Sequence, residues 1–131
     1  MITRRTRIQE IIGGTKDGTY DWDALYDLLE HPSSLVRLNA MVALGATTPR
    51  DHLMRYALRD HLYLTALEDE NTVPPYNVLQ NRHMAIAVML HLEYIDGAHP
   101  LYRNLTRFYQ ELIVERVLPS LASEQARRQK D

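Results

Sequence analysis

The chain has 131 residues, of which 45% are hydrophobic and 24% are charged, and its formal net charge is -2. These proportions fit one globular domain that buries a core, and the near-neutral balance does not point to a nucleic acid or an anionic membrane. The absence of cysteine excludes disulfides, thiolate metal sites and a thiol nucleophile, and it fits a reducing cytoplasm.

The first 19 residues predict one short helix and a turn. Residues 3–12 place Ile8, Ile11 and Ile12 on one face of a helix. We expect Gly13-Gly14 to end this helix, because glycine is the usual residue just past a helix C-terminus.

Residues 20–46 predict two helices joined by a tight turn. Asp21 is a suitable N-cap for the first helix, and the His-Pro pair at 31–32 ends it, because proline disfavours a helical residue before it. Either Ser33 or Ser34 caps the second helix, which is almost entirely apolar and is therefore expected in the interior.

Residues 48–96 predict a longer pair of helices. Thr48-Pro49 is a helix start signal, and the helical pattern continues to about Glu68, as one helix or as two with a break near Asp60.

An irregular loop over residues 69–76 follows, since its two adjacent prolines do not fit inside a helix. Asn77 is then expected to cap a second buried helix that runs to about Ile95.

Residues 100–131 predict one more helix, which Pro100 opens and Pro119 kinks or ends. We expect the charged tail from Glu124 onward to fray. The candidates for the inner face of this helix are Leu101, Leu105, Phe108, Tyr109, Leu112 and Val117.

The two buried helices share a pattern: Arg37 falls on Arg82, and Ala40 falls on Ala85, 45 residues later. The first helix pair, with Val36-Arg37 at the start of its second helix and Ala40 three residues after the arginine, resembles a HEAT repeat. The resemblance implies a curved stack of helix pairs that binds proteins or, less often, nucleic acids along its inner helices. The expected fold is all-α: one domain over residues 1–131, a short right-handed α-α superhelix of about six helices with two HEAT-like pairs.

The candidate binding residues lie mostly on the two inner helices. The recurrent arginines have a structural interpretation, in which each bonds turn carbonyls or an acidic neighbour, and a functional one, in which both bind an acidic ligand. Tyrosine is a frequent interface anchor. The predicted binding residues are Arg37, Asn39, Arg82, His83 and Tyr56.

No catalytic motif, metal site or cofactor site is predicted. His83 and His91 are eight residues apart, so on a helix they lie about 12 Å from each other, too far to share one ion. The sequence also has no glycine-rich phosphate loop and no Gly-x-Ser-x-Gly elbow.

We therefore expect a non-catalytic protein-binding module or small adaptor in the cytoplasm, with a protein partner or a second copy of itself. One alternative is a nucleic-acid-binding helical repeat, and another is an enzyme or pigment-handling protein of the HEAT-like class. The longest apolar run, residues 84–90, is too short for a membrane helix, so no membrane association is expected. The nucleic-acid alternative would use Arg4, Arg5, Arg7, Arg37, Arg55 and Arg59.

Overall fold

The computed structural model describes residues 4–47, 49, 51–68 and 79–129, and every regular element within them is a helix. The expected all-α class is confirmed. In chain order the elements are α1 (Arg4–Asp17), α2 (Trp22–Asp27), the 3-10 helix η1 (Leu28–Glu30), α3 (Ser34–Gly45), α4 (His52–Leu67), α5 (Asn81–His91), α6 (Pro100–Arg103), α7 (Arg107–Leu112), the π-helix η2 (Ile113–Val117) and α8 (Leu118–Gln129).

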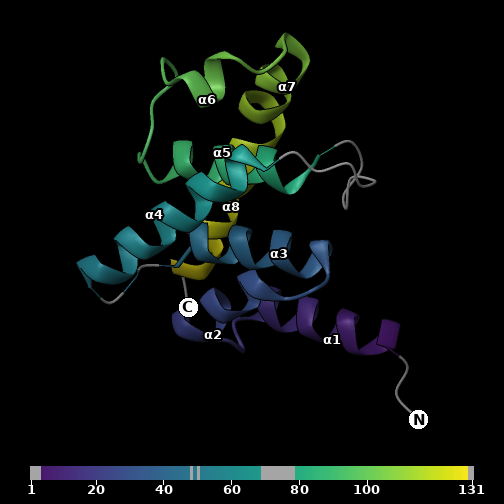
Figure 1. The fold of residues 1–131 in the computed structure, drawn as a ribbon. Coiled ribbons are helices and arrows are strands. Elements are labelled where there is room, and N and C mark those ends of the chain that lie inside the picture. Colours follow the sequence, from purple (N-terminus) through teal and green to yellow (C-terminus); the bar gives the residue numbers. More distant parts are fainter. Residues whose placement is uncertain (1–3, 48, 50, 69–78, 130–131) are drawn as a thin grey trace.

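Helices α3 and α5 lie next to each other in the core, and the other long helices pack around them (Figure 1). Helix α3 contacts α1, α2 and η1 and also α5, while α5 in turn contacts α4 and α8. As the apolar patterns predict, both helices are interior. Their most deeply buried side chains include Val36, Ala40, Leu44, Ala85, Val88 and Met89.

Helix α5 is shorter than predicted at both ends. It begins at Asn81 with Gln80 as its N-cap, while the loop expected at 69–76 and the cap expected at Asn77 lie outside the described residues. It ends at His91, because Glu93 adopts a left-handed conformation with φ 64° and closes the helix. The predicted extension to Ile95 is wrong.

Helix α1 is longer than predicted, because it continues through Gly13-Gly14 to Asp17. Directly after α1, Gly18 has a left-handed backbone with φ 83°, and the Thr19 amide donates to the Gly14 carbonyl at 3.2 Å. Glycine at position 14 has another role: a Cβ there would lie 2.5 Å from Cε2 of Tyr20. Gly14 therefore permits a close approach of Tyr20 and does not mark a helix end.

The caps of the next helices are partly as expected. The Asp21 carboxylate accepts from the Ala24 amide at 2.9 Å, and Ser33 Oγ accepts from the Val36 amide at 3.4 Å. Helix α4, however, starts after Asp51, whose carboxylate accepts from the Met54 amide at 2.9 Å. The start predicted at Thr48-Pro49 is therefore three residues too early, and α4 runs unbroken past Asp60.

The helix predicted from Pro100 is interrupted. Helix α6 ends at Arg103, and the Gln110 amide group donates to the Tyr102 carbonyl at 3.2 Å and the Arg103 carbonyl at 3.0 Å. These bonds satisfy carbonyls that a continuing helix would have satisfied.

The expected break at Pro119 takes another form. The helical path widens into the π-helix η2 just before this proline and then continues as α8. The Leu118 amide donates to the Ile113 carbonyl, a wider spacing than in an α-helix. The wider turn relieves the contact between a proline ring and the preceding turn.

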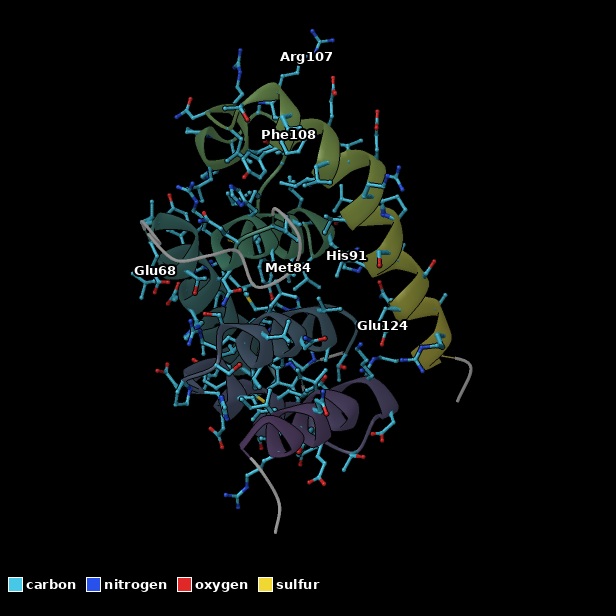
Figure 2. The ribbon with its side chains drawn as sticks, turned by 90° about the vertical axis from the view of Figure 1, so that its right-hand side faces the viewer. Glu68, Met84, His91, Arg107, Phe108 and Glu124 are labelled. Carbon is cyan, nitrogen blue, oxygen red and sulfur yellow. The ribbon has the colours of Figure 1, made fainter. Side chains whose placement is uncertain are left out.

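Helix α8 lies along the side of the stack from α7 down to α1 (Figure 2). Arg127 donates to the Lys16 carbonyl at 2.7 Å, and Arg128 donates to the Thr15 carbonyl. The tail predicted to fray from Glu124 is therefore helical to Gln129, because its arginines bond the free carbonyls at the end of α1.

Candidate protein-binding surface

The Arg37 guanidinium bonds the turn that precedes its own helix. Its Nη1 donates to the carbonyls of His31 at 2.8 Å and Pro32 at 3.1 Å, and its Nη2 donates to Ser34 Oγ at 3.0 Å. This matches the structural interpretation of the first arginine. The side chain fastens the turn between η1 and α3, which leaves few of its donors for a ligand.

Asn39 and Arg82 also bond locally. The Asn39 side chain donates to the Leu35 carbonyl at 2.8 Å, one turn back along α3. Arg82 Nε donates to Gln80 Oε1 at 2.8 Å, so it bonds the residue that caps α5. The two arginines that align in sequence thus have different partners.

His83 lies in the core, with only 1% of its surface exposed. Its Nδ1 accepts from the Gln80 amide at 3.2 Å, and its ring stacks on Tyr109 with centroids 3.8 Å apart. Burial, and then the nearby Arg82 charge, lowers the pKa of His83 from 6.5 to about 4. The ring is therefore neutral at pH 7, and it supports the packing of α7 on α5 without facing solvent.

Tyr56 lies on the outer face of α4, where 51% of its surface is exposed and the Arg59 guanidinium carbon sits 4.8 Å from its ring centre. The opposite face of α4 packs into the core. Side chains buried there are Leu58, Leu62, Thr65 and Ala66.

Helix α4 therefore has two apolar faces. On the outer face Leu53 is 80% exposed, Leu64 67% and Leu67 60%. The spacing pattern in the sequence shows only that the helix is rich in apolar residues, and it does not reveal that they divide between two faces. We call the exposed set the α4 stripe, which consists of Leu53, Tyr56, Tyr63, Leu64 and Leu67.

A cavity of about 380 Å³ lies beside the C-terminal half of this stripe, between η1, α3, α4 and α5. At its wall Asn81 is 1% exposed, and its Nδ2 donates to the Ser34 carbonyl at 3.2 Å, which joins α5 to α3. Its Oδ1 is buried without a hydrogen-bond partner. Sequence reasoning missed Asn81, because nothing in the pattern shows that this helix start faces the start of α3. The other lining residues are Leu29, Glu30, Arg37, Met41, His61, Leu64, Thr65 and Glu68.

At this cavity, His61 Nδ1 and Glu30 Oε1 lie 3.7 Å apart. The Glu30 side chain is 82% exposed, so this contact is a weak surface interaction. Among the described residues, no group of three or more His, Cys, Asp or Glu side chains is arranged to hold a metal ion.

The arginines of the nucleic-acid alternative are scattered. Arg55 and Arg59 are exposed on α4, Arg7 is exposed on α1, and Arg37 is bonded to its turn. The side chains of Arg4 and Arg5 lie outside the described set. No helix in the described part of the chain has the length and apolar character that crossing a bilayer requires.

No family model, no curated protein and no solved structure matches this chain.

Proposed function

We propose that this chain is a protein-binding module that binds its partner through the α4 stripe. The observation that carries the proposal is the exposure of five large apolar side chains on one side of a helix whose other side is buried. Contiguous exposed apolar surface of this kind typically marks an interface, whereas scattered apolar residues do not.

The composition of the stripe supports a protein partner. Tyr56 and Tyr63 combine a large ring with a hydroxyl, and tyrosine is enriched among the residues that dominate binding energy. Arg59 lies against Tyr56, so the edge of the surface carries a cation as well. By contrast, the inner-helix candidates Arg37 and His83 are occupied by contacts within the fold.

We propose a short HEAT-like superhelix as the framework of this module. Support comes from the order of contacts: α2 and η1 pack on α3, α4 packs on α5, and α3 packs on α5. In this arrangement α4 is an outer helix, so the binding surface differs from the inner face that the resemblance implies. The lack of cysteine supports a reducing compartment such as the cytoplasm.

Site-specific photo-cross-linking tests the proposed function. A benzophenone amino acid replaces Tyr56 or Leu64 in the full chain, which is expressed in its native cells and irradiated. We expect a covalent protein adduct at both positions, because a bound partner must lie against the stripe.

The matched control places the same probe at Glu115, which is exposed on η2 at a distance along the chain from α4. Adducts at both stripe positions but not at the control support the proposal. If neither stripe position yields an adduct while the variants remain folded by circular dichroism, the proposal is wrong.

A further inference from the structure

We infer that the cavity between η1, α3, α4 and α5 binds a small neutral molecule that has an apolar body and an N–H donor group. This inference goes beyond the protein-binding function proposed above, because it concerns a small-molecule ligand and stands without that function. It rests on the volume of the cavity, on the apolar side chains of its wall and on one buried oxygen atom that has no hydrogen-bond partner.

The oxygen atom is Oδ1 of Asn81. The Asn81 side chain is part of the cavity wall, and only 1% of the residue is exposed. Its Nδ2 donates to the Ser34 carbonyl at 3.2 Å, and this bond fixes the orientation of the amide group. Among the described residues that line the cavity, Asn81 is the one with a buried side-chain atom that lacks a partner. Because an unpaired buried acceptor is costly, a ligand that donates to Oδ1 gains free energy.

Two other polar side chains of the wall already have partners. The Arg37 guanidinium donates to two carbonyls and one hydroxyl of the turn before α3. The Thr65 hydroxyl donates to the His61 carbonyl at 3.0 Å. The position in the buried wall that still needs a hydrogen bond is therefore an acceptor, and the matching ligand group is an N–H donor.

The rest of the cavity suits an apolar body of small-molecule size. Leu29 and Met41 contribute buried apolar side chains to its wall, and Leu64 contributes an exposed one. The volume of about 380 Å³ lies within the range of small-molecule pockets, which is roughly 300–1,000 Å³. Such pockets typically combine apolar walls with a few polar groups that orient the ligand.

The charges around the cavity favour a neutral ligand. Glu30 and Glu68 carry negative charge at its wall, and Arg37 carries positive charge there. An anion would be repelled by the two carboxylates, and a cation would be repelled by the guanidinium. A neutral molecule avoids both repulsions and the cost of moving a charge out of water.

A pair of matched probes tests the inference on the wild type alone. Indole has an apolar ring system and one N–H donor, and N-methylindole has the same rings with a methyl group in place of the hydrogen. Titration of the isotope-labelled full chain, followed by NMR, gives both dissociation constants and locates the site. We expect indole to bind about tenfold or more tightly than N-methylindole, because only indole donates to Asn81 Oδ1. The largest chemical-shift changes should fall on residues of the cavity wall.

The variant Asn81→Leu removes the acceptor and keeps a side chain of similar size. It should abolish the difference in affinity between indole and N-methylindole, an effect that a general loosening of the fold would not produce. Asn39→Leu is the matched control, because it makes the same change on α3 at a residue outside the cavity wall. This control should leave the preference for indole intact.

The other outcomes are equally decisive. Equal binding of the two probes to the wild type, binding of neither, or shifts confined to another part of the molecule would overturn the inference. A third probe, N-acetyltryptophanamide, separates two sources of the same chemistry. If it binds like indole, the ligand includes a tryptophan side chain; if only indole binds, the cavity takes a free small molecule. Neither result bears on whether photo-probes on the α4 stripe capture a protein, so the two proposals fail separately.

Discussion

The imidazole of His83 stacks on the phenol of Tyr109 with ring planes 12° apart, which joins α5 to α7. The same imidazole accepts a hydrogen bond through Nδ1 from the Gln80 amide at the start of α5. A protonated ring would be a donor at both nitrogens and would lose this bond. The contact therefore requires neutral histidine, in agreement with its lowered pKa.

The His83 environment predicts a loss of stability in mild acid. The folded-state pKa of about 4 lies below the ordinary 6.5, so the unfolded chain binds the proton first. Stability is present above the unfolded pKa and falls as the pH drops toward 4, by on the order of 2 kcal/mol. Urea unfolding of wild type and His83→Gln at pH 7 and pH 4.5 should show a stability difference that shrinks in acid. A stability difference between wild type and His83→Gln that is the same at pH 7 and pH 4.5 would contradict the prediction.

The two glycines of α1 should respond oppositely to alanine. A Cβ at Gly13 meets nothing within 4 Å, so Gly13→Ala should stabilise the protein by about 0.5–1 kcal/mol through helix propensity. The Cβ of Gly14→Ala would press on the Tyr20 ring, so this variant should gain nothing or lose stability. Thermal unfolding of both variants measures the contrast, and equal stabilisation would show that Tyr20 moves away freely.

The contact between α8 and α1 should stabilise the end of α1. The double variant Arg127→Ala/Arg128→Ala removes the donors to the Lys16 and Thr15 carbonyls, at a cost of about 1–2 kcal/mol. Hydrogen exchange should become faster in the last turn of α1. Arg107→Ala, which breaks only an exposed bond to Glu111, is the control and should leave α1 unchanged. Unchanged exchange in the double variant would mean that this contact adds no stability.

The ion pairs of Glu124 with Arg127 and Arg128 within α8 should weaken in acid. Burial would raise the pKa of Glu124, but hydrogen bonds from Arg127 and Arg128 outweigh it and hold the pKa below 4.5. Stability from this carboxylate is therefore present above its unfolded pKa and is lost as the pH falls through the lower folded value. Glu124→Gln should destabilise the protein at pH 7, and this destabilisation should shrink as the pH falls below 4.5, as measured by urea unfolding. A destabilisation by Glu124→Gln that stays the same as the pH falls would contradict this prediction.

Asn81 should tolerate an apolar replacement better than a charged one. Asn81→Asp removes the donor to the Ser34 carbonyl and leaves a buried carboxylate, whereas Asn81→Leu removes the same bond and buries no polar atom. We expect the aspartate variant to be less stable than the leucine variant by about 2 kcal/mol at pH 7. The gap should narrow in acid as the carboxyl group binds a proton. Chemical denaturation of both variants checks this, and equal stabilities would show that the carboxylate is solvated.

The sequence alone was enough to predict the all-α class and the two interior helices. Local chemistry governs these features: Asp21 and Ser33 cap their own helices, and the apolar run after Arg37 has few polar side chains to face solvent. The His-Pro pair at 31–32 also acts locally, because it ends η1 at Glu30. Ser33, one of the two predicted N-caps of α3, is the observed cap.

Helix ends that depend on distant packing were predicted poorly. In the sequence, Gly14 predicts the end of a helix, but in the structure it allows the close approach of Tyr20. The C-terminal tail is charged and has no apolar stripe, which predicts fraying. In the structure, Arg127 and Arg128 donate hydrogen bonds to carbonyls of α1, more than 100 residues earlier in the chain. Sequence periodicity does not contain such partners.

The candidate surface likewise has one feature that the sequence predicts and one that only the tertiary structure shows. Composition and spacing predicted a helical segment rich in leucine and tyrosine from Thr48-Pro49 to about Glu68, because side-chain period acts within a few residues. Only the tertiary structure decided which of its two apolar faces is buried, because α5 covers Leu58 and Leu62 and leaves Leu53 and Leu64 in solvent. Burial depends on which surfaces of the folded chain meet, and that is a long-range property.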